Sequence, residues 1–338
     1  MDLNDFSALM LPAVEKELQK GCQSPLSDPT QTGLKDMLSY HLGWQGEGAG
    51  KKAQGKRIRA LMCLLSAGSC GTPWQDALPG AAAIELIHNF SLIHDDIEDR
   101  SEQRHSRPTV WKQWGEAQAI NAGDTMFTLA FHHLTTATKN DFYDIAPSAL
   151  SLLVETCIRL TSGQYLDLYY ENLSTLNIAD YWTMVGGKTA ALLAASAQMG
   201  ALFARANETV QVDFYQFGFN LGLAFQAQDD YLGIWGDCAL TGKSTENDLL
   251  AGKKSLPVVY ALAHDPVFTD RWKSGELHPD ELLAVTAQLE KDGAKDFTLQ
   301  QVEEFTTLSL SCLDRLNLTN AEGRALHELA QKLIHRAV

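Results

Sequence analysis

The sequence HNFSLIHDDIED at residues 88–99 decides how the rest of the chain is interpreted. Its apolar residues recur at three- and four-residue spacings, which predicts a helix. On a helix, Asp95 and Asp99 lie one turn apart on the same face, and His88 lies two turns before Asp95. Carboxylates at this spacing repel one another by about 0.2–0.5 kcal/mol. The stretch therefore indicates either a solvated acidic helix end or a site for a hard divalent cation, which prefers carboxylate oxygens.

A second acidic pair, Asp229 and Asp230, ends another apolar stretch far downstream. Gly218 and Gly222 lie on the same predicted stripe as Asp229, so they leave room in front of the carboxylates. Two carboxylate clusters without basic partners would be costly to bury. Mg²⁺ ions and a polyanionic ligand would relieve that cost, and we expect the two pairs to bind them together.

Basic side chains bracket both acidic pairs in the sequence. They are Lys51, Lys52, Lys56, Arg57 and Arg59, then Arg104 and Arg107, then Lys188, Lys243, Lys253 and Lys254. Taken singly, each is more often a surface charge. As a set, they are typical of a diphosphate held by Mg²⁺ on one side and by Lys and Arg on the other. Lys188 also opens a predicted helix, whose N-terminus favours phosphate.

The composition limits the class of protein. The chain has 338 residues, of which 45% are hydrophobic and 20% charged, a globular balance. Its net charge of -15 argues against nucleic acid or an anionic membrane as partner. The six cysteines form no Cys-x-x-Cys pair, the N-terminus lacks a signal peptide, and the longest apolar window is too short to span a bilayer. We expect a cytoplasmic protein without a membrane span.

Helical patterns dominate the whole chain. They predict helices near residues 1–24, 58–71, 116–138, 279–291, 298–315 and 320–336, besides the two that carry the acidic pairs. No proline occurs between Pro147 and Pro257, which suits long helices. Residues 25–50, with two prolines and a Gly-rich end, are expected to form a loop. Without a repeat or a linker, the sequence predicts a single all-α domain over 1–338, one large helical bundle around a central cavity.

These residues resemble the trans-isoprenyl diphosphate synthases, the polyprenyl synthetase family, from about Gly55 to Leu262. GKRIR at 55–59 is similar to the family's Gly-Lys-Arg-x-Arg motif. DDIED at 95–99 matches its first aspartate-rich motif, with His88 at the expected distance. Further matches are Arg107-Pro-Thr109, Asn121-Ala-Gly-Asp124, Gly163-Gln164 with Asp167, Gly187-Lys-Thr189, Gln226, Asp229-Asp230 and Lys253-Lys254. The resemblance implies the isoprenoid synthase fold.

The resemblance also implies roles for individual residues. The metal ligands, for three Mg²⁺ ions with diphosphate bound, would be Asp95, Asp99 and Asp229, assisted by Asp96 and Asp230. The residues that hold the allylic diphosphate would be Arg104, Lys188, Gln226 and Lys253. Isopentenyl diphosphate would be held by Lys56, Arg59 and His88, and substrate would also be bound by Thr189 and Lys243. The catalytic set would be Asp95, Asp99, Arg104, Lys188 and Asp229.

The implied reaction is a Mg²⁺-dependent condensation of isopentenyl diphosphate with an allylic prenyl diphosphate, by ionisation, condensation and deprotonation. The resemblance implies a homodimer, to which the apolar stretch 116–134 would contribute. Phe90, one and a half turns before Asp95, would form a floor under the growing product, with small Ser91 leaving some depth. The resemblance implies, by the family's habit, a linear trans product of 15–20 carbons, with geranylgeranyl diphosphate favoured. The alternative is that Phe90 simply packs in the core.

Two departures from the family pattern leave other functions open. His105 and Ser106 stand where the family usually has Arg-Gly, and the second arginine normally serves isopentenyl diphosphate. Gly233 replaces the last aspartate of the second motif, with Asp237 one turn further on. Both departures favour a terpene cyclase on the same scaffold, which ionises a prenyl diphosphate without isopentenyl diphosphate. The retained Lys56, Arg59 and His88 favour a synthase.

A third hypothesis is a non-catalytic subunit that binds a true synthase. The intact Asp95, Asp99 and Lys188 argue against it, because a subunit without a reaction of its own has no need of them.

Overall fold

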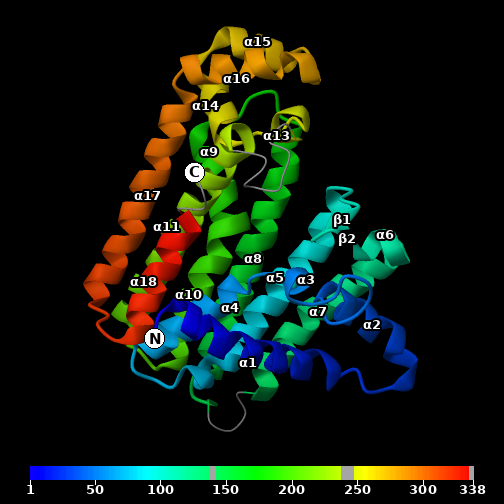
Figure 1. Ribbon diagram of the computed structural model, residues 1–338, viewed down its shortest axis with the longest axis vertical. Helices are drawn as coiled ribbons and strands as arrows, with labels where there is room; N and C mark the ends of the chain where they lie inside the picture. The colour runs from blue at the N-terminus through cyan, green and yellow to red at the C-terminus, as the bar shows by residue number, and fades with distance from the viewer. Residues whose placement is uncertain (138–141, 237–246, 335–338) are drawn as a thin grey trace. The chain divides into compact units, whose positions relative to one another are not determined.

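Helices make up almost all of the regular structure of this chain, as its computed structural model shows (Figure 1). The structure describes residues 1–137, 142–236 and 247–334. Within these ranges the only strands are β1 (Gln103–Arg104) and β2 (Arg107–Pro108), which form a small antiparallel hairpin. The predicted all-α fold is confirmed.

The chain divides into two compact units. Unit 1 comprises Met1–Glu155, Ala195–Gln211 and Leu318–Leu326, and unit 2 comprises Thr156–Ala194, Val212–Asn317 and His327–Val338. Boundaries fall within α8 (Ala146–Glu171), α10 (Ala191–Phe203), α11 (Glu208–Trp235) and α18 (Ala321–Ile334), and one more, between Asn317 and Leu318, precedes α18. The single domain over residues 1–338 and its central cavity stay predictions.

Unit 1 is built around α5 (Leu78–Glu98), the helix that ends in the first acidic pair. It packs against α7 (Glu116–Ala137), α4 (Ile58–Ser69) and α1 (Leu3–Gln23). Residues 80–87 of α5 are all buried, and apart from Gly80 and Glu85 they are alanine or larger aliphatic residues, as in a helix packed on several faces. The other elements of this unit are η1 (Pro29–Gln31), α2 (Thr32–His41), α3 (Lys51–Gln54), η2 (Trp74–Ala77) and α6 (Val110–Trp114).

In unit 2, α14 (Leu256–His264) packs against its neighbours in the chain and against α9 (Ile178–Val185). Its buried Val258 joins Leu289 and Ala294 in one apolar cluster. A π-helical turn, η3 (Gly186–Ala190), follows α9 directly. The remaining elements are α13 (Asn247–Leu250), α15 (Pro266–Lys273), η4 (Pro279–Glu281), α16 (Leu282–Lys291) and α17 (Ala294–Leu316).

One part of the expected loop at 25–50 is wrong, because it contains α2. Pro29 starts a short 3₁₀ turn whose first N–H groups are capped by the Asp28 side chain, and the chain then continues into a helix. Met37, Leu38 and Tyr40 are buried, so tertiary packing stabilises a helix that the prolines concealed. The Gly-rich stretch from residue 43 to 50 is irregular, as predicted.

No helix among the described residues combines the length and the hydropathy needed to cross a membrane.

Candidate active site

The first acidic pair lies at the end of α5, as the sequence predicted. The Asp99 N–H donates to the Asp95 carbonyl at 2.8 Å, so the two residues are one turn apart. Asp95 is partly buried and Asp99 exposed. Asp96 is only 2% exposed and accepts from Arg104, with N–O distances of 2.9–3.1 Å. Burial raises the pKa of Asp96, and Arg104 opposes that rise.

The β-hairpin places Arg104 and Arg107 opposite one another across its ladder. Its two turn residues, His105 and Ser106, both have positive φ, 52° and 60°. Such turns strongly favour Asn and Gly, since side chains crowd the backbone there. The family's glycine at the Ser106 position is therefore explained by the positive φ, which glycine adopts without steric cost.

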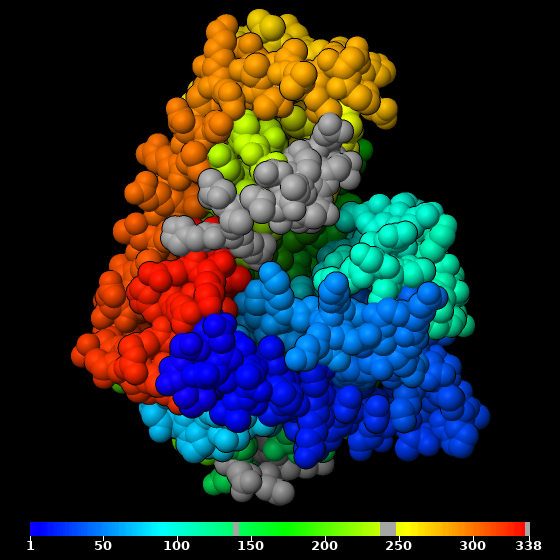
Figure 2. All heavy atoms as spheres, in the orientation of Figure 1, coloured from blue at the N-terminus to red at the C-terminus, as the bar shows by residue number. Residues whose placement is uncertain are grey.

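Arg107 turns away from the acidic pair and fixes the Gly-rich loop. Its guanidinium donates to the carbonyls of Tyr40, Gln45 and Glu47 at 2.7–2.9 Å. It also stacks over the Tyr40 ring at 4.0 Å, and the Tyr40 hydroxyl donates to the Pro108 carbonyl. The loop and the hairpin lie next to each other on the surface of unit 1 (Figure 2).

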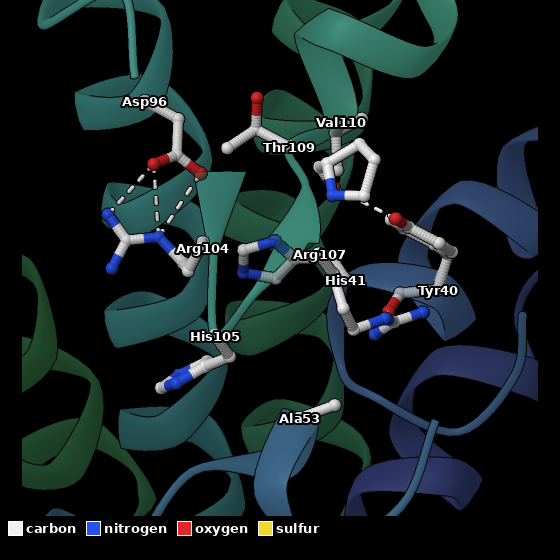
Figure 3. Close-up of a pocket in the computed structure, with 10 residues that line it drawn as sticks. Tyr40, His41, Ala53, Asp96, Arg104, His105, Arg107, Thr109 and Val110 are labelled. Atoms are coloured by element: carbon white, nitrogen blue, oxygen red, sulfur yellow. Dashed lines mark hydrogen bonds and ion pairs between the residues drawn. The ribbon is translucent and has the colours of Figure 1, made fainter. Parts of the chain in front are cut away.

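A pocket opens between the hairpin and the end of α2 (Figure 3). Its lining residues are Tyr40, His41, Ala53, Asp96, Arg104, His105, Arg107, Pro108, Thr109 and Val110. The His41 ring points into the pocket (Figure 3). Burial, and then the charges of Arg104 and Arg57, lower the pKa of His41 to about 3.

The predicted binding residues for isopentenyl diphosphate gather elsewhere in the same unit. Nη1 of Arg59 lies 3.1 Å from Nε2 of His88, and burial lowers the pKa of that histidine well below its usual value. Lys56 is exposed just before them. A Cβ on Gly55 would lie 3.7 Å from Nε2 of His105, so the imidazole that replaces the family's second arginine sits beside the basic loop.

The second acidic pair lies within α11, which continues to Trp235, so this pair does not end its helix as expected. Its environment differs from that of the first pair. Asp229 is partly buried, whereas Asp230 is 7% exposed. The Asp230 carboxylate accepts from the Tyr181 hydroxyl at 2.6 Å, from Nε2 of Gln226 at 2.9 Å and from the Leu256 N–H at 2.7 Å. Burial raises the pKa of Asp230 to about 6, although these three hydrogen bonds lower it in part.

Lys188 and Thr189 lie in the π-helical turn after α9. A Cβ on Gly187 would come within 2.6 Å of the Arg159 carbonyl, so only glycine allows α8 to approach the turn this closely. The approach brings Lys188 into an ion pair with Asp167. Thr189 donates to Oε1 of Gln226 at 2.9 Å, which connects the turn to Asp230.

The second departure from the family has a structural counterpart. A Cβ on Gly233 would overlap a carboxylate oxygen of Asp248, from α13. A carboxylate from another element thus occupies the space next to the missing aspartate. Lys253 lies 3.9 Å from the same Asp248. Lys243 and Asp237 fall outside the described residues.

A family model described as polyprenyl synthetase matches residues 49–275. The chain belongs to the polyprenyl synthetase family. It is 35% identical over 322 residues to a (2E,6E)-farnesyl diphosphate synthase of Mycobacterium tuberculosis, covering 92% of this chain and 88% of the relative. A geranylgeranyl diphosphate synthase of the same bacterium is 42% identical over 231 residues, covering 68% and 65%. The crystal structure of a geranylgeranyl pyrophosphate synthetase from Pyrococcus horikoshii has a TM-score of 0.89 at 29% identity, over 99% of both chains.

Membership of the polyprenyl synthetase family confirms three predictions: the family itself, the all-α isoprenoid synthase fold, and an enzyme of the prenyltransferase class. The relatives named above are all prenyl diphosphate synthases, which lends no support to the cyclase alternative.

The donor set suits a hard cation. Both acidic pairs offer carboxylate oxygens only, which Mg²⁺ prefers. Across the described ranges, no three or more His, Cys, Asp or Glu side chains gather into a metal-binding group.

Sequence reasoning missed three residues near these sites: His41, Tyr181 and Asp248. None belongs to a motif that the sequence displayed. Tyr181 contacts the site through Asp230, 49 positions on in the chain. Only Asp248 had a signal, since it stands between the basic residues Lys243 and Lys253.

Proposed function

We propose that this chain is a Mg²⁺-dependent trans-prenyltransferase. It condenses isopentenyl diphosphate with an allylic prenyl diphosphate to give a linear trans-prenyl diphosphate of 15–20 carbons. The observation that carries the proposal is the contact of Arg59 with His88, with exposed Lys56 beside them. A cyclase has no need of such a basic site for a second diphosphate.

In this proposal the acidic pairs hold the metal. The ligands are Asp95, Asp99 and Asp229, with Asp96 and Asp230 assisting. Bound Mg²⁺ would stabilise negative charge on the departing diphosphate.

The cationic and amide side chains bind the two diphosphates. Those for the allylic diphosphate are Arg104, Lys188, Thr189, Gln226 and Lys253, and those for isopentenyl diphosphate are Lys56, Arg59 and His88. Arg104 and Lys188 are each paired with a carboxylate, Asp96 and Asp167. The paired carboxylates hold these cations in place before a diphosphate arrives. Lys243 belongs to the same proposed set, outside the described residues.

The chemistry follows from these roles. The allylic C–O bond breaks, and its electrons leave with the diphosphate. The double bond of isopentenyl diphosphate attacks the allylic cation, and a proton is then lost to the departing diphosphate. The protein's own part is to orient both substrates and to keep water away from the cation.

We assign to Phe90 the role of limiting the length of the product. This ring is buried on α5 and packs edge-on against Phe127 of α7, with centroids 4.9 Å apart. Phe127 packs in turn against Phe131. A row of rings below Asp95 supports a floor for a product of 15–20 carbons. Phe90→Ala should lengthen the products, as measured by chromatography and mass spectrometry. Unchanged products would mean that Phe90 only packs in the core.

We further propose a cytoplasmic homodimer, with residues 116–134 of α7 contributing to the interface. Ile120 is exposed on that helix. The cysteines of the described part are free thiols, which suits a reducing compartment: Cys22, Cys63, Cys70, Cys157 and Cys312.

One experiment tests the activity. The purified protein is incubated with Mg²⁺, isopentenyl diphosphate and, in turn, dimethylallyl, geranyl and farnesyl diphosphate. We expect longer linear diphosphates that require isopentenyl diphosphate. A hydrocarbon or alcohol formed without it would identify a cyclase instead. No turnover of any substrate would favour the non-catalytic subunit.

A further inference from the structure

Arg57, the middle cation of the basic loop, does not share the surroundings of its neighbours. Lys56 before it is exposed, but the Arg57 side chain is 4% exposed. Its Nε donates to Oε1 of Glu15 at 2.8 Å, and its Nη2 donates to the Leu42 carbonyl at 3.2 Å. Its Nη1 lies 3.7 Å from Oε2 of Glu85. One guanidinium thus ties the loop to α1, to the end of α2 and to α5.

Glu85 connects this tie to the predicted binding residues. It is 1% exposed, and its Oε1 accepts the Ala60 N–H at 3.1 Å. Ala60 is the third residue of α4, and N–H groups in a first turn have no partner within the helix. The same carboxylate therefore fixes the start of α4 and contacts Arg57. It stands three residues before His88 on α5, so it shares a helix face with that histidine.

Glu15 extends the network to the Gly-rich loop. Its second oxygen accepts from Nε1 of Trp44 at 2.6 Å. One buried cation and two carboxylates thus join α1, α5 and the two ends of the segment between residues 42 and 57. Breaking one member of such a network leaves the others uncompensated.

The backbone of Arg57 is unusual as well. Its φ of 46° and ψ of 40° are left-handed, a conformation that is unfavourable for residues with a Cβ. Arg57 directly precedes α4, where the chain changes direction into the helix that carries Arg59. The side-chain contacts to Glu15 and Glu85 hold this conformation.

We propose that Arg57 is a positioning residue for the second substrate. Held by Glu15 and Glu85, it sets where Lys56 and Arg59 meet the diphosphate of isopentenyl diphosphate. This inference rests on the proposed function of the basic loop. The contrasting explanation is that the buried network only stabilises unit 1.

The first test is Arg57→Met, which keeps an unbranched apolar stem and removes the guanidinium with its charge and donors. We expect KM for isopentenyl diphosphate to rise about 10- to 100-fold, because small displacements of binding groups have effects of that size. KM for the allylic diphosphate and kcat should stay near their wild-type values. Arg57→Lys should recover only part of the loss, since an ammonium cannot reach three acceptors as a planar fork does.

A second variant distinguishes a positioning role of Arg57 from a purely stabilising role. Arg57→Met alone leaves two buried carboxylates without their cation and is expected to lower the melting temperature. The double variant Arg57→Met/Glu85→Gln removes one of those charges and keeps an oxygen for the Ala60 N–H. We expect its melting temperature to recover while KM for isopentenyl diphosphate stays high. Recovery of both together would overturn the proposal in favour of a purely stabilising network.

The matched control is Glu17→Gln on the same helix as Glu15. Glu17 lies 3.2 Å from Nε2 of His133 and does not touch the loop. It should lower the melting temperature and leave KM for isopentenyl diphosphate unchanged. An equal rise in KM in this control would overturn the positioning role.

Lys56→Ala and Arg59→Ala distinguish this proposal from the function on which it rests. If these variants raise KM for isopentenyl diphosphate and the Arg57 variants do not, the loop binds the substrate but Arg57 does not position it. If Lys56→Ala and Arg59→Ala leave that KM unchanged, the assignment of the loop itself is wrong.

Discussion

The two acidic pairs share a sequence pattern and differ in what surrounds them. In each Asp-Asp pair the first residue is partly buried and the second is buried. Asp96 is held by the charge of Arg104, on a hairpin that also brings His105 near the basic loop. Asp230 is held by neutral donors: a phenol, an amide and a backbone N–H.

This difference assigns different tasks to the two second aspartates. Asp96 fixes a cation that the proposed reaction uses, so its pairing is part of the substrate site. Asp230 fixes α9, α11 and the start of α14 to one another within unit 2, so its hydrogen bonds belong to the framework. In both pairs the first aspartate is left to act as the principal metal ligand in the proposal.

The largest effect is expected at the first aspartate of each pair. Asp95→Asn and Asp229→Asn should each lower kcat by about 100- to 1000-fold, because each removes charge stabilisation from the reacting diphosphate. Melting temperatures should change little, since both side chains are partly exposed. Steady-state assays with saturating Mg²⁺ measure this, and Asp270→Asn, an exposed aspartate on α15, is the control. Full activity in Asp95→Asn would rule out its metal role.

Replacing the second aspartate of each pair should lower the free energy of unfolding by different amounts. Asp230→Asn removes one acceptor oxygen and the negative charge that strengthens the hydrogen bonds from Tyr181, Gln226 and the Leu256 N–H. We expect the free energy of unfolding to fall by about 1–3 kcal/mol. Asp96→Asn should cost less, since Arg104 is 31% exposed and can turn to water. Denaturant titration measures both, and equal losses would contradict the contrast between a framework acid and a substrate-site acid.

Burial of His41, together with the basic groups around it near the first acidic pair, predicts a pH dependence. The pKa of His41 is about 3 in the fold, against 6.5 in an unfolded chain. The charged and titratable groups around it are Arg57, Arg104, Arg107, His105 and Asp96. Above pH 6.5 neither state protonates this histidine, so it contributes nothing. As pH falls below 6.5, only the unfolded chain takes up the proton, and stability is lost at about 1.4 kcal/mol per pH unit until pH approaches 3.

Equilibrium unfolding at pH 7.5, 6.5 and 5.5 measures this slope. His41→Gln should reduce the slope of the unfolding free energy against pH by about 1.4 kcal/mol per pH unit, which corresponds to one proton. The control is His132→Gln, at an exposed position on α7, which should keep the wild-type slope. A slope that His41→Gln does not change would show that burial in the fold does not keep His41 neutral.

The smallest effect concerns the hairpin that carries Arg104. Ser106→Gly removes a side chain from a left-handed position, worth about 1–2 kcal/mol, but adds freedom to the unfolded chain. We expect a net gain in stability of about 0.5 kcal/mol, measured as a small rise in melting temperature. The corresponding change at Ser255, at the start of α14 in unit 2, should destabilise, because φ there is -65°. A loss at Ser106 would show that its side chain supports the turn.

The sequence predicted the acidic pairs, the helices that carry them and the neighbouring basic groups, because these depend on local spacing. It failed where long-range partners decide the outcome. Helix α2 forms because Met37 and Leu38 are buried. Arg57 turns inward because Glu15, 42 positions earlier, receives it. The motif at residues 55–59 identifies the basic residues, but it does not predict which of them is exposed and which is buried.

The Gly-rich loop between residues 43 and 50 has a practical consequence. Its composition marks it as a flexible surface linker, the kind of place chosen for inserting a tag or joining another domain. Arg107 nevertheless binds two of its carbonyls and one just before it, and the same arginine stands across the hairpin from Arg104. Extra residues there would pull on the hairpin that carries Arg104, so this loop is a poor place for an insertion in spite of its composition.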